Sequence, residues 1–178
     1  MKHFETAVFA NGCFWCTEAV FTRLKGVQSV SPGYTGGSVP EPTYENVSLG
    51  TTGHAEAIKI TYDPTVISYD DFLAVFFNTH DPTTLNRQGN DVGTQYRSAI
   101  FYSTAEEKEK AERVIQELNE AYAYDRPVVT EVTPLGTFYA AEDYHRNYYA
   151  LHPDQRYCQL VIEPKLEKLH ERFKSLLA

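Results

Sequence analysis

The segment at residues 4–16, FETAVFANGCFWC, decides the fold because a strand pattern changes into a helix pattern at a single glycine. Residues 4–10 predict a strand that stops at Asn11 and Gly12. We expect a helix at 13–24, ended by Gly26. The chain therefore starts with a strand–helix pair that places Cys13 at the beginning of the helix.

The rest of the chain repeats this order. The patterns predict further strands at 27–34, 55–62, 97–102 and 128–133, and helices at 68–78, 104–122, 142–151 and 164–177. Two βαβ units in succession predict an α+β fold, a single-domain two-layer sandwich with a ferredoxin-like (split βαβ) core and a C-terminal helix. The loops at 35–53 and 80–95 are longer than packing requires, so we expect them to carry function.

Composition narrows the functional classes. The 178 residues predict one domain, 1–178, with 42% hydrophobic and 22% charged residues. A net charge of −8 disfavours general nucleic-acid binding, and no apolar run reaches the ~18 residues that a membrane span needs. Three cysteines do not make a disulfide scaffold, and the first residues lack an apolar signal region, so we expect a cytoplasmic protein.

Cys13 and Cys16 are the candidate reactive residues. A cysteine that opens a helix faces free backbone N–H groups, so we expect the pKa of Cys13 to lie below that of a free thiol. Cys16 follows three residues later on the same helix face, where the pair can close a disulfide. The alternatives are two buried cysteines or half of a zinc site, although no second Cys-x-x-Cys accompanies them.

Phe14 and Trp15 stand between these cysteines and are bulky for the spacer of a dithiol oxidoreductase. Two large rings beside a nucleophile favour a pocket for an apolar group of the substrate. The alternative is that both rings belong to the hydrophobic core.

Five motifs, in one order, give the chain a family resemblance. They are Gly-Cys-Phe-Trp-Cys at 12–16, Gly-Tyr-Thr-Gly-Gly at 33–37, Pro-Thr-Tyr-Glu at 42–45, Gly-His-Ala-Glu at 53–56 and Gly-Asn-Asp-Val-Gly-Thr-Gln-Tyr-Arg-Ser at 89–98. Over about residues 7–168 the chain resembles the peptide methionine sulfoxide reductases of the A class. The resemblance implies an α+β sandwich that reduces the S epimer of methionine sulfoxide, in proteins and as the free amino acid, and so repairs oxidised proteins.

The resemblance also implies roles for single residues. Cys13 would attack the sulfoxide sulfur, and Glu56, kept protonated near neutral pH by its aromatic surroundings, would donate a proton to the oxygen. The substrate would be held by Tyr44 and Tyr96 at its oxygen, Asp91 beside them, and Phe14 and Trp15 at its methyl group. Spacing alone favours a solvated acid for Glu56, a turn residue for Asp91 and packing for most tyrosines, so these roles depend on the resemblance.

Attack by Cys13 would leave a sulfenic acid, which a second thiol must convert into a disulfide. Cys16 is slightly favoured by its spacing. Cys158 follows a His-Pro step, as the late cysteine of many relatives does, yet it leads into an apolar segment typical of a buried core thiol. The resemblance implies recycling by thioredoxin and a monomer, and we expect no cofactor because the chain has no dinucleotide or phosphate-loop motif.

Three other classes remain open. A general Cys-x-x-Cys disulfide oxidoreductase would have no use for Glu56. A cysteine hydrolase would need His54 or His145 close to Cys13. A non-enzymatic binding module with an aromatic groove would tolerate the loss of Cys13. The stretch at 142–145, inside a long aromatic segment, is a further candidate for lining the site.

Overall fold

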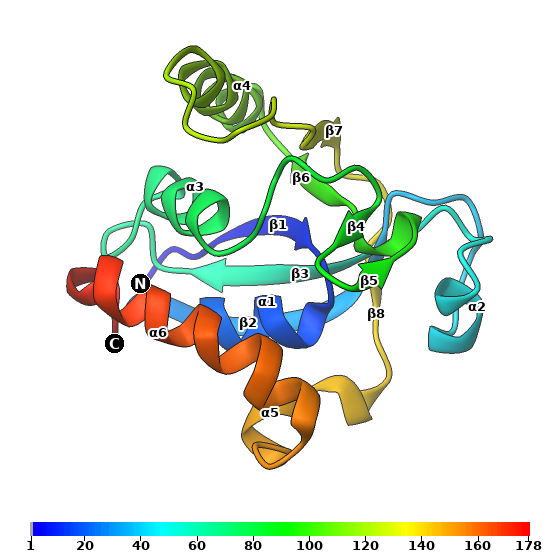
Figure 1. Ribbon diagram of the computed structural model, residues 1–178. Coiled ribbons are helices and arrows are strands. Elements are labelled where there is room, and N and C mark those ends of the chain that lie inside the picture. Colours follow the sequence, from blue (N-terminus) through cyan, green and yellow to red (C-terminus); the bar gives the residue numbers. More distant parts are fainter. Residues whose placement is uncertain (1) are drawn as a thin grey trace.

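The computed structural model describes residues 2–178, and Figure 1 shows a twisted sheet with helices packed against it. Six strands are hydrogen-bonded in the order β7-β6-β1-β3-β2-β8. Their bounds are β1 Glu5–Asn11, β2 Val27–Thr35, β3 Ala55–Tyr62, β6 Ser98–Tyr102, β7 Glu131–Pro134 and β8 Tyr139–Ala140. All neighbouring strands are antiparallel except β6 and β7, which are parallel.

Two helices connect the central strands. Helix α1 (Phe14–Phe21) joins β1 to β2, and α3 (Tyr69–Asn78) joins β3 to β6. The four central strands therefore lie in the order β6-β1-β3-β2, the split βαβ arrangement, and the predicted α+β fold is confirmed. The other helices are α2 Tyr44–Ser48, α4 Ala105–Glu120, α5 Tyr148–Leu151 and α6 Glu163–Arg172. No helix within residues 2–178 is long and apolar enough to span a membrane.

Alternation along β1 supplies both faces of the sheet, as a period of two requires. Phe9 is fully buried toward the helices, where its ring packs against a group of four aromatic rings at centroid distances of 5.4–6.3 Å, Phe21, Tyr69, Phe72 and Phe76. Val8 and Ala10 face the other side with Phe101. The segment between β7 and β8 covers that side with Leu135 and Phe138, so both faces of the sheet are covered.

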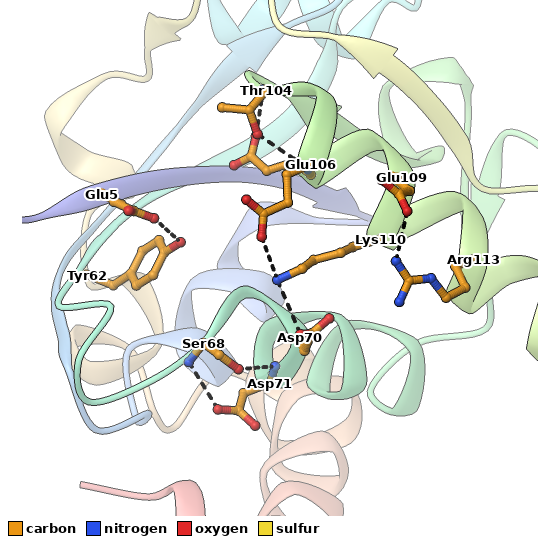
Figure 2. A network of polar contacts seen from close by, with 11 residues as sticks. Glu5, Tyr62, Ser68, Asp70, Asp71, Thr104, Glu106, Glu109, Lys110 and Arg113 are labelled. Carbon is orange, nitrogen blue, oxygen red and sulfur yellow. Dashed lines mark hydrogen bonds and ion pairs between the residues drawn. The ribbon is translucent and has the colours of Figure 1, made fainter.

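Polar contacts hold α4 against α3 and fix where both helices begin. Figure 2 shows Lys110 between Asp70 of α3, at 3.3 Å, and Glu106 of α4, at 3.1 Å. Ser68 and Thr104 each close the predicted capping box, so α3 and α4 begin one residue later. The ion pairs, whose carboxylates are exposed, add at most about 1 kcal/mol each, and α4 also packs on the core through the buried Ala111 and the partly buried Val114, Ile115 and Leu118.

The structure differs from the predicted elements in three places. The predicted helix at 142–151 is broken, because Asn147 takes a left-handed φ of 53° between a 3₁₀ turn (Asp143–His145) and α5. The C-terminal helix ends at Arg172 rather than at 177, and a π-helical turn, Cys158–Ile162, precedes it. The two long loops contain α2 and a small hairpin, β4 (Arg87–Gln88) with β5 (Asp91–Val92).

Candidate active site

Cys13 stands between β1 and α1, and the backbone before it places it there. Gly12 has a φ of +110°, and a Cβ atom at this position would lie 2.9 Å from the side chain of Gln88. Cys13 is the N-cap residue of α1, with its carbonyl accepting from the backbone N–H of Cys16 at 3.0 Å. The residue is 9% exposed, so its thiol reaches the surface only narrowly.

The expectation that the pKa of Cys13 lies below that of a free thiol is wrong. Burial raises this pKa well above its usual value, and the hydrogen bond to Cys16 and the charge of Glu56 raise it further. The backbone N–H of Trp15 acts in the opposite direction but is outweighed. The pKa of Cys16 is lowered, chiefly by its contact with the Cys13 thiol and then by the phenol of Tyr157, although burial acts in the opposite direction.

Glu56, on β3, carries a buried carboxyl group beside this pair. Its side chain is 1% exposed, and Oε1 accepts a hydrogen bond from the backbone N–H of Phe14 at 3.1 Å. Desolvation raises the pKa of Glu56 to about 8, with smaller contributions from the charges of Asp91 and Cys16. The carboxyl group is therefore protonated near neutral pH, as expected from the sequence.

Two tyrosines and one aspartate complete the predicted polar set. Burial, followed by the charges of Glu56 and Cys13, raises the pKa of Tyr44 to about 12. The pKa of Tyr96 is raised by burial first and then by Glu56, so both phenols remain neutral and lie within electrostatic reach of the same two groups. Asp91 Oδ2 accepts a hydrogen bond from the phenol of Tyr157 at 2.8 Å.

The rings of Phe14 and Trp15 occupy different environments. Phe14 is fully buried in the core, with its ring centroid 4.9 Å from that of His145. Trp15 is half-buried, stacks on Tyr148 at a centroid distance of 3.6 Å, and donates its Nε1–H to His145 Nδ1 at 2.9 Å. Trp15 is thus partly exposed, whereas Phe14 belongs to the core, and both rings lie against His145.

A cavity of about 620 Å³ opens beside the sulfur atoms. Among residues 2–178 its lining includes Cys13, Cys16 and Asp91, but not Glu56 or Tyr44. The carboxyl group of Glu56 and the phenol of Tyr44 therefore lie near Cys13 but not in the wall of this cavity.

Cys158 belongs to the same small apolar cluster as the other two cysteines. It is fully buried, as is Ile162 of the same cluster, and all three cysteines are free. The structure therefore brings a third thiol into the neighbourhood of Cys13 and Cys16, while also giving it the environment of a core residue.

Two polar residues of the cavity lining, Tyr157 and Lys165, were not among the predicted site residues. The Tyr157 phenol lies 3.4 Å from the Cys16 sulfur, and the only sequence signal is its position next to Cys158. Lys165 lines the cavity and donates to the carbonyl of Thr79 at 2.7 Å. The amphipathic pattern of the C-terminal helix does not distinguish a partly buried lysine from an exposed one, so the sequence does not indicate that Lys165 lines a cavity.

The histidine roles considered for a hydrolase find no support in the geometry. His54 uses both ring nitrogens inside its own loop, accepting from Gly37 N at 3.0 Å and bonding the Val39 carbonyl at 2.7 Å. His145 Nδ1 is occupied by the indole of Trp15. Within residues 2–178 no group of three metal-ligating side chains is present.

Comparison with known proteins gives a consistent result. The family model described as "Peptide methionine sulfoxide reductase" matches residues 5–177. The peptide methionine sulfoxide reductase MsrA of Thermus thermophilus is 57% identical over 97% of both chains, and that of Deinococcus radiodurans is 56% identical over 97% of this chain and 84% of its own.

Solved structures agree with the sequence relatives. The reduced form of Mxr1 from Saccharomyces cerevisiae superposes with a TM-score of 0.78, at 31% identity, over 87% of this chain and 89% of its own. Methionine sulfoxide reductase A of Corynebacterium diphtheriae gives 0.75 at 36% identity, over 84% of this chain and 76% of its own. Mxr1 has also been solved in complex with Trx2. With a family model matching almost its whole length and relatives above 50% identity, the chain belongs to the peptide methionine sulfoxide reductases, the enzymes named MsrA.

Proposed function

We propose that this enzyme reduces the S epimer of methionine sulfoxide, in oxidised proteins and as the free amino acid, through a Cys13 sulfenic acid and an intramolecular disulfide. The observation that carries the proposal is the contact between Glu56 and the start of α1. A carboxyl group that is protonated near neutral pH lies beside a cysteine pair in which the pKa of Cys16 is lowered. Sulfoxide reduction needs both groups, because a nucleophile attacks sulfur while the departing oxygen takes a proton.

The first step uses the two cysteines together. The Cys16 thiolate accepts the proton of the Cys13 thiol, and the Cys13 sulfur attacks the sulfoxide sulfur. The oxygen passes to Cys13 and takes the proton of Glu56, so the products are methionine, a Cys13 sulfenic acid and a Glu56 carboxylate. Tyr44 and Tyr96 donate hydrogen bonds to the sulfoxide oxygen, and their raised pKa values support this role because they keep both phenols protonated. Trp15, backed by Phe14, contacts the methyl group.

The second step restores the site. The Cys16 thiol attacks the sulfenic sulfur of Cys13, and a disulfide and one water molecule form. The position of Cys16 in the first turn of α1, directly after Cys13, supports Cys16 as the resolving residue, while Cys158 lies in the same cluster as the competing candidate. A dithiol protein then reduces the disulfide. Thioredoxin is the proposed reductant, supported by the complex of the relative Mxr1 with Trx2.

We further propose that the enzyme acts as a monomer in the cytoplasm, where its thiols stay reduced.

One assay tests the proposal against the rival activities. The enzyme is incubated with dithiothreitol and a mixture of the two methionine sulfoxide epimers, with C13S as the matched control. We expect loss of the S epimer alone and no turnover by the variant. Consumption of the R epimer at an equal rate would refute the assigned stereochemistry, and rapid insulin reduction without sulfoxide turnover would favour a general disulfide oxidoreductase.

Peptide mass spectrometry assigns the resolving thiol. The enzyme is treated with one equivalent of sulfoxide in the absence of reductant and then digested. We expect a Cys13–Cys16 disulfide in the wild type and a persistent Cys13 sulfenic acid, or a slower Cys13–Cys158 disulfide, in C16S. A Cys13–Cys158 bond as the first disulfide in the wild type would overturn the role proposed for Cys16.

A further inference from the structure

His145 is a fully buried histidine that the reaction proposed above does not use. Its ring lies among aromatic rings from two parts of the chain, with centroid distances of 4.9 Å to Phe14 and 5.8 Å to Trp15 of α1 and 4.5 Å to Tyr44 of α2. The strongest polar contact is the one from the indole Nε1–H of Trp15 to His145 Nδ1, at 2.9 Å.

This contact determines the protonation of the imidazole. An indole nitrogen only donates, so Nδ1 must accept, and the neutral ring carries its proton on Nε2. Nε2 is itself buried and has no hydrogen-bond partner among residues 2–178. A buried N–H without a partner is costly to folding, and a phenylalanine would fill the same space without that cost. What histidine adds at this position is therefore the acceptor for the indole.

The indole is held at two points. Tyr148 covers one face of the ring, at an interplanar angle of 3°, and His145 binds the Nε1–H at the edge. Stacking alone permits the indole ring to slide and rotate within its plane. A directional hydrogen bond at the ring edge restricts both motions. Trp15 remains half-buried, so it keeps surface that a substrate can contact.

We propose that His145 is a positioning residue, which holds the indole of Trp15 in the orientation that receives the apolar end of the sulfoxide substrate. The inference depends on the proposed contact between Trp15 and the substrate methyl group. It assigns His145 no contact with the reacting atoms. A correctly oriented ring lowers the cost of binding, since no side-chain freedom is lost when the substrate arrives.

Two substitutions separate the hydrogen bond from the packing. H145F keeps a ring of similar size and removes the acceptor. H145N loses the ring but carries Oδ1 at the same distance along the side chain as Nδ1, so it retains an acceptor for the indole. If His145 acts through its hydrogen bond, H145N is the milder change, and if it acts only by filling space, H145F is the milder change.

The readouts are steady-state kinetics with the S epimer and the fluorescence of the free protein, in which Trp15 is the only tryptophan. For H145F we expect about a tenfold rise in KM with kcat changed less than about twofold, together with a shifted emission maximum and greater acrylamide quenching. For H145N we expect both quantities to stay closer to the wild type. Circular dichroism and thermal melting establish that each variant is folded.

Several results would overturn the inference. They are a wild-type KM or an unchanged emission in folded H145F, a larger defect in H145N than in H145F, or a fall in kcat without a rise in KM. The emission experiment contains no substrate, so it tests the contact between His145 and Trp15 even if the proposed reaction fails. A wild-type enzyme that turned over no S epimer would refute the proposed function instead.

Discussion

Replacing Glu56 with glutamine tests the central electrostatic claim, because glutamine keeps the shape of the side chain and never ionises. The pKa of Glu56 is about 8 in the folded protein, against 4.5 for an exposed glutamate. The folded state therefore binds more protons than the unfolded state between these two values. Stability must fall as the pH rises through this window, because ionisation of the buried carboxyl is the costly event.

The magnitude follows from the two pKa values. Relative to a neutral side chain, Glu56 reduces the free energy of unfolding by about 2 kcal/mol at pH 6 and by about 5 kcal/mol at pH 9. Wild type should thus lose about 3 kcal/mol more than E56Q over this range. Urea unfolding at pH 6, 7.5 and 9, with a reductant present, measures the difference between the two proteins. Other groups that titrate in this range contribute to both proteins and largely cancel in the comparison.

The same variant also tests the chemistry. Without a proton donor at the oxygen, kcat/KM for the S epimer should fall by a factor of about 10²–10⁴. Wild-type activity should decline as Glu56 ionises above pH 8. If stability depended on pH in parallel for wild type and E56Q, Glu56 would have an ordinary pKa and the reasoning would fail. If E56Q kept its activity, Glu56 would have no part in the reaction.

Two further substitutions test the surroundings of the site and the core. Y157F removes a phenol that helps to lower the pKa of Cys16. The rate of Cys16 alkylation at pH 7, measured by mass spectrometry, should therefore fall by about tenfold. An unchanged rate would contradict the role of that hydrogen bond. F9A removes a fully buried ring at the centre of the aromatic cluster. The free energy of unfolding, measured by guanidinium chloride titration, should fall by about 3–5 kcal/mol. A loss below about 1 kcal/mol would contradict the place of Phe9 in the core.

The sequence predicts the core of the fold because local and long-range signals agree there. Alternation at 55–62, now β3, and the capping boxes at Ser68 and Thr104 identify a strand and two helices, and the order of the elements indicates the split βαβ arrangement. The prediction fails at 142–151, where we expected a helix. Backbone geometry decides that segment instead, since Asn147 adopts a left-handed conformation that no pattern of apolar residues reveals.

The site could be predicted only in part, for a physical reason. Motifs indicate which residue types belong together, and the structure does bring Cys13, Glu56 and Tyr44 into one electrostatic group. Burial depends on distant segments that fold over the motif. Tyr157 reaches the Cys16 sulfur from 141 positions away, and no spacing rule connects two residues so far apart.

The wrong expectation for Cys13 shows how burial competes with the helix N-terminus in setting the pKa of a thiol. A helix N-terminus favours a thiolate by about 1 kcal/mol in an exposed position, and its backbone N–H groups do lower the pKa here. Enclosure costs a charged group more than that, so the pKa of Cys13 rises, whereas hydrogen bonds with Cys13 and Tyr157 lower the pKa of Cys16. Glu56 then stays neutral, because burial and its neighbours Asp91 and Cys16 oppose a second negative charge in the same space. A cysteine with a lowered pKa and a carboxyl group with a raised pKa thereby lie in one site. That combination is what an attack on sulfur with protonation of oxygen requires, and it arises from the coupling of the groups rather than from the helix terminus alone.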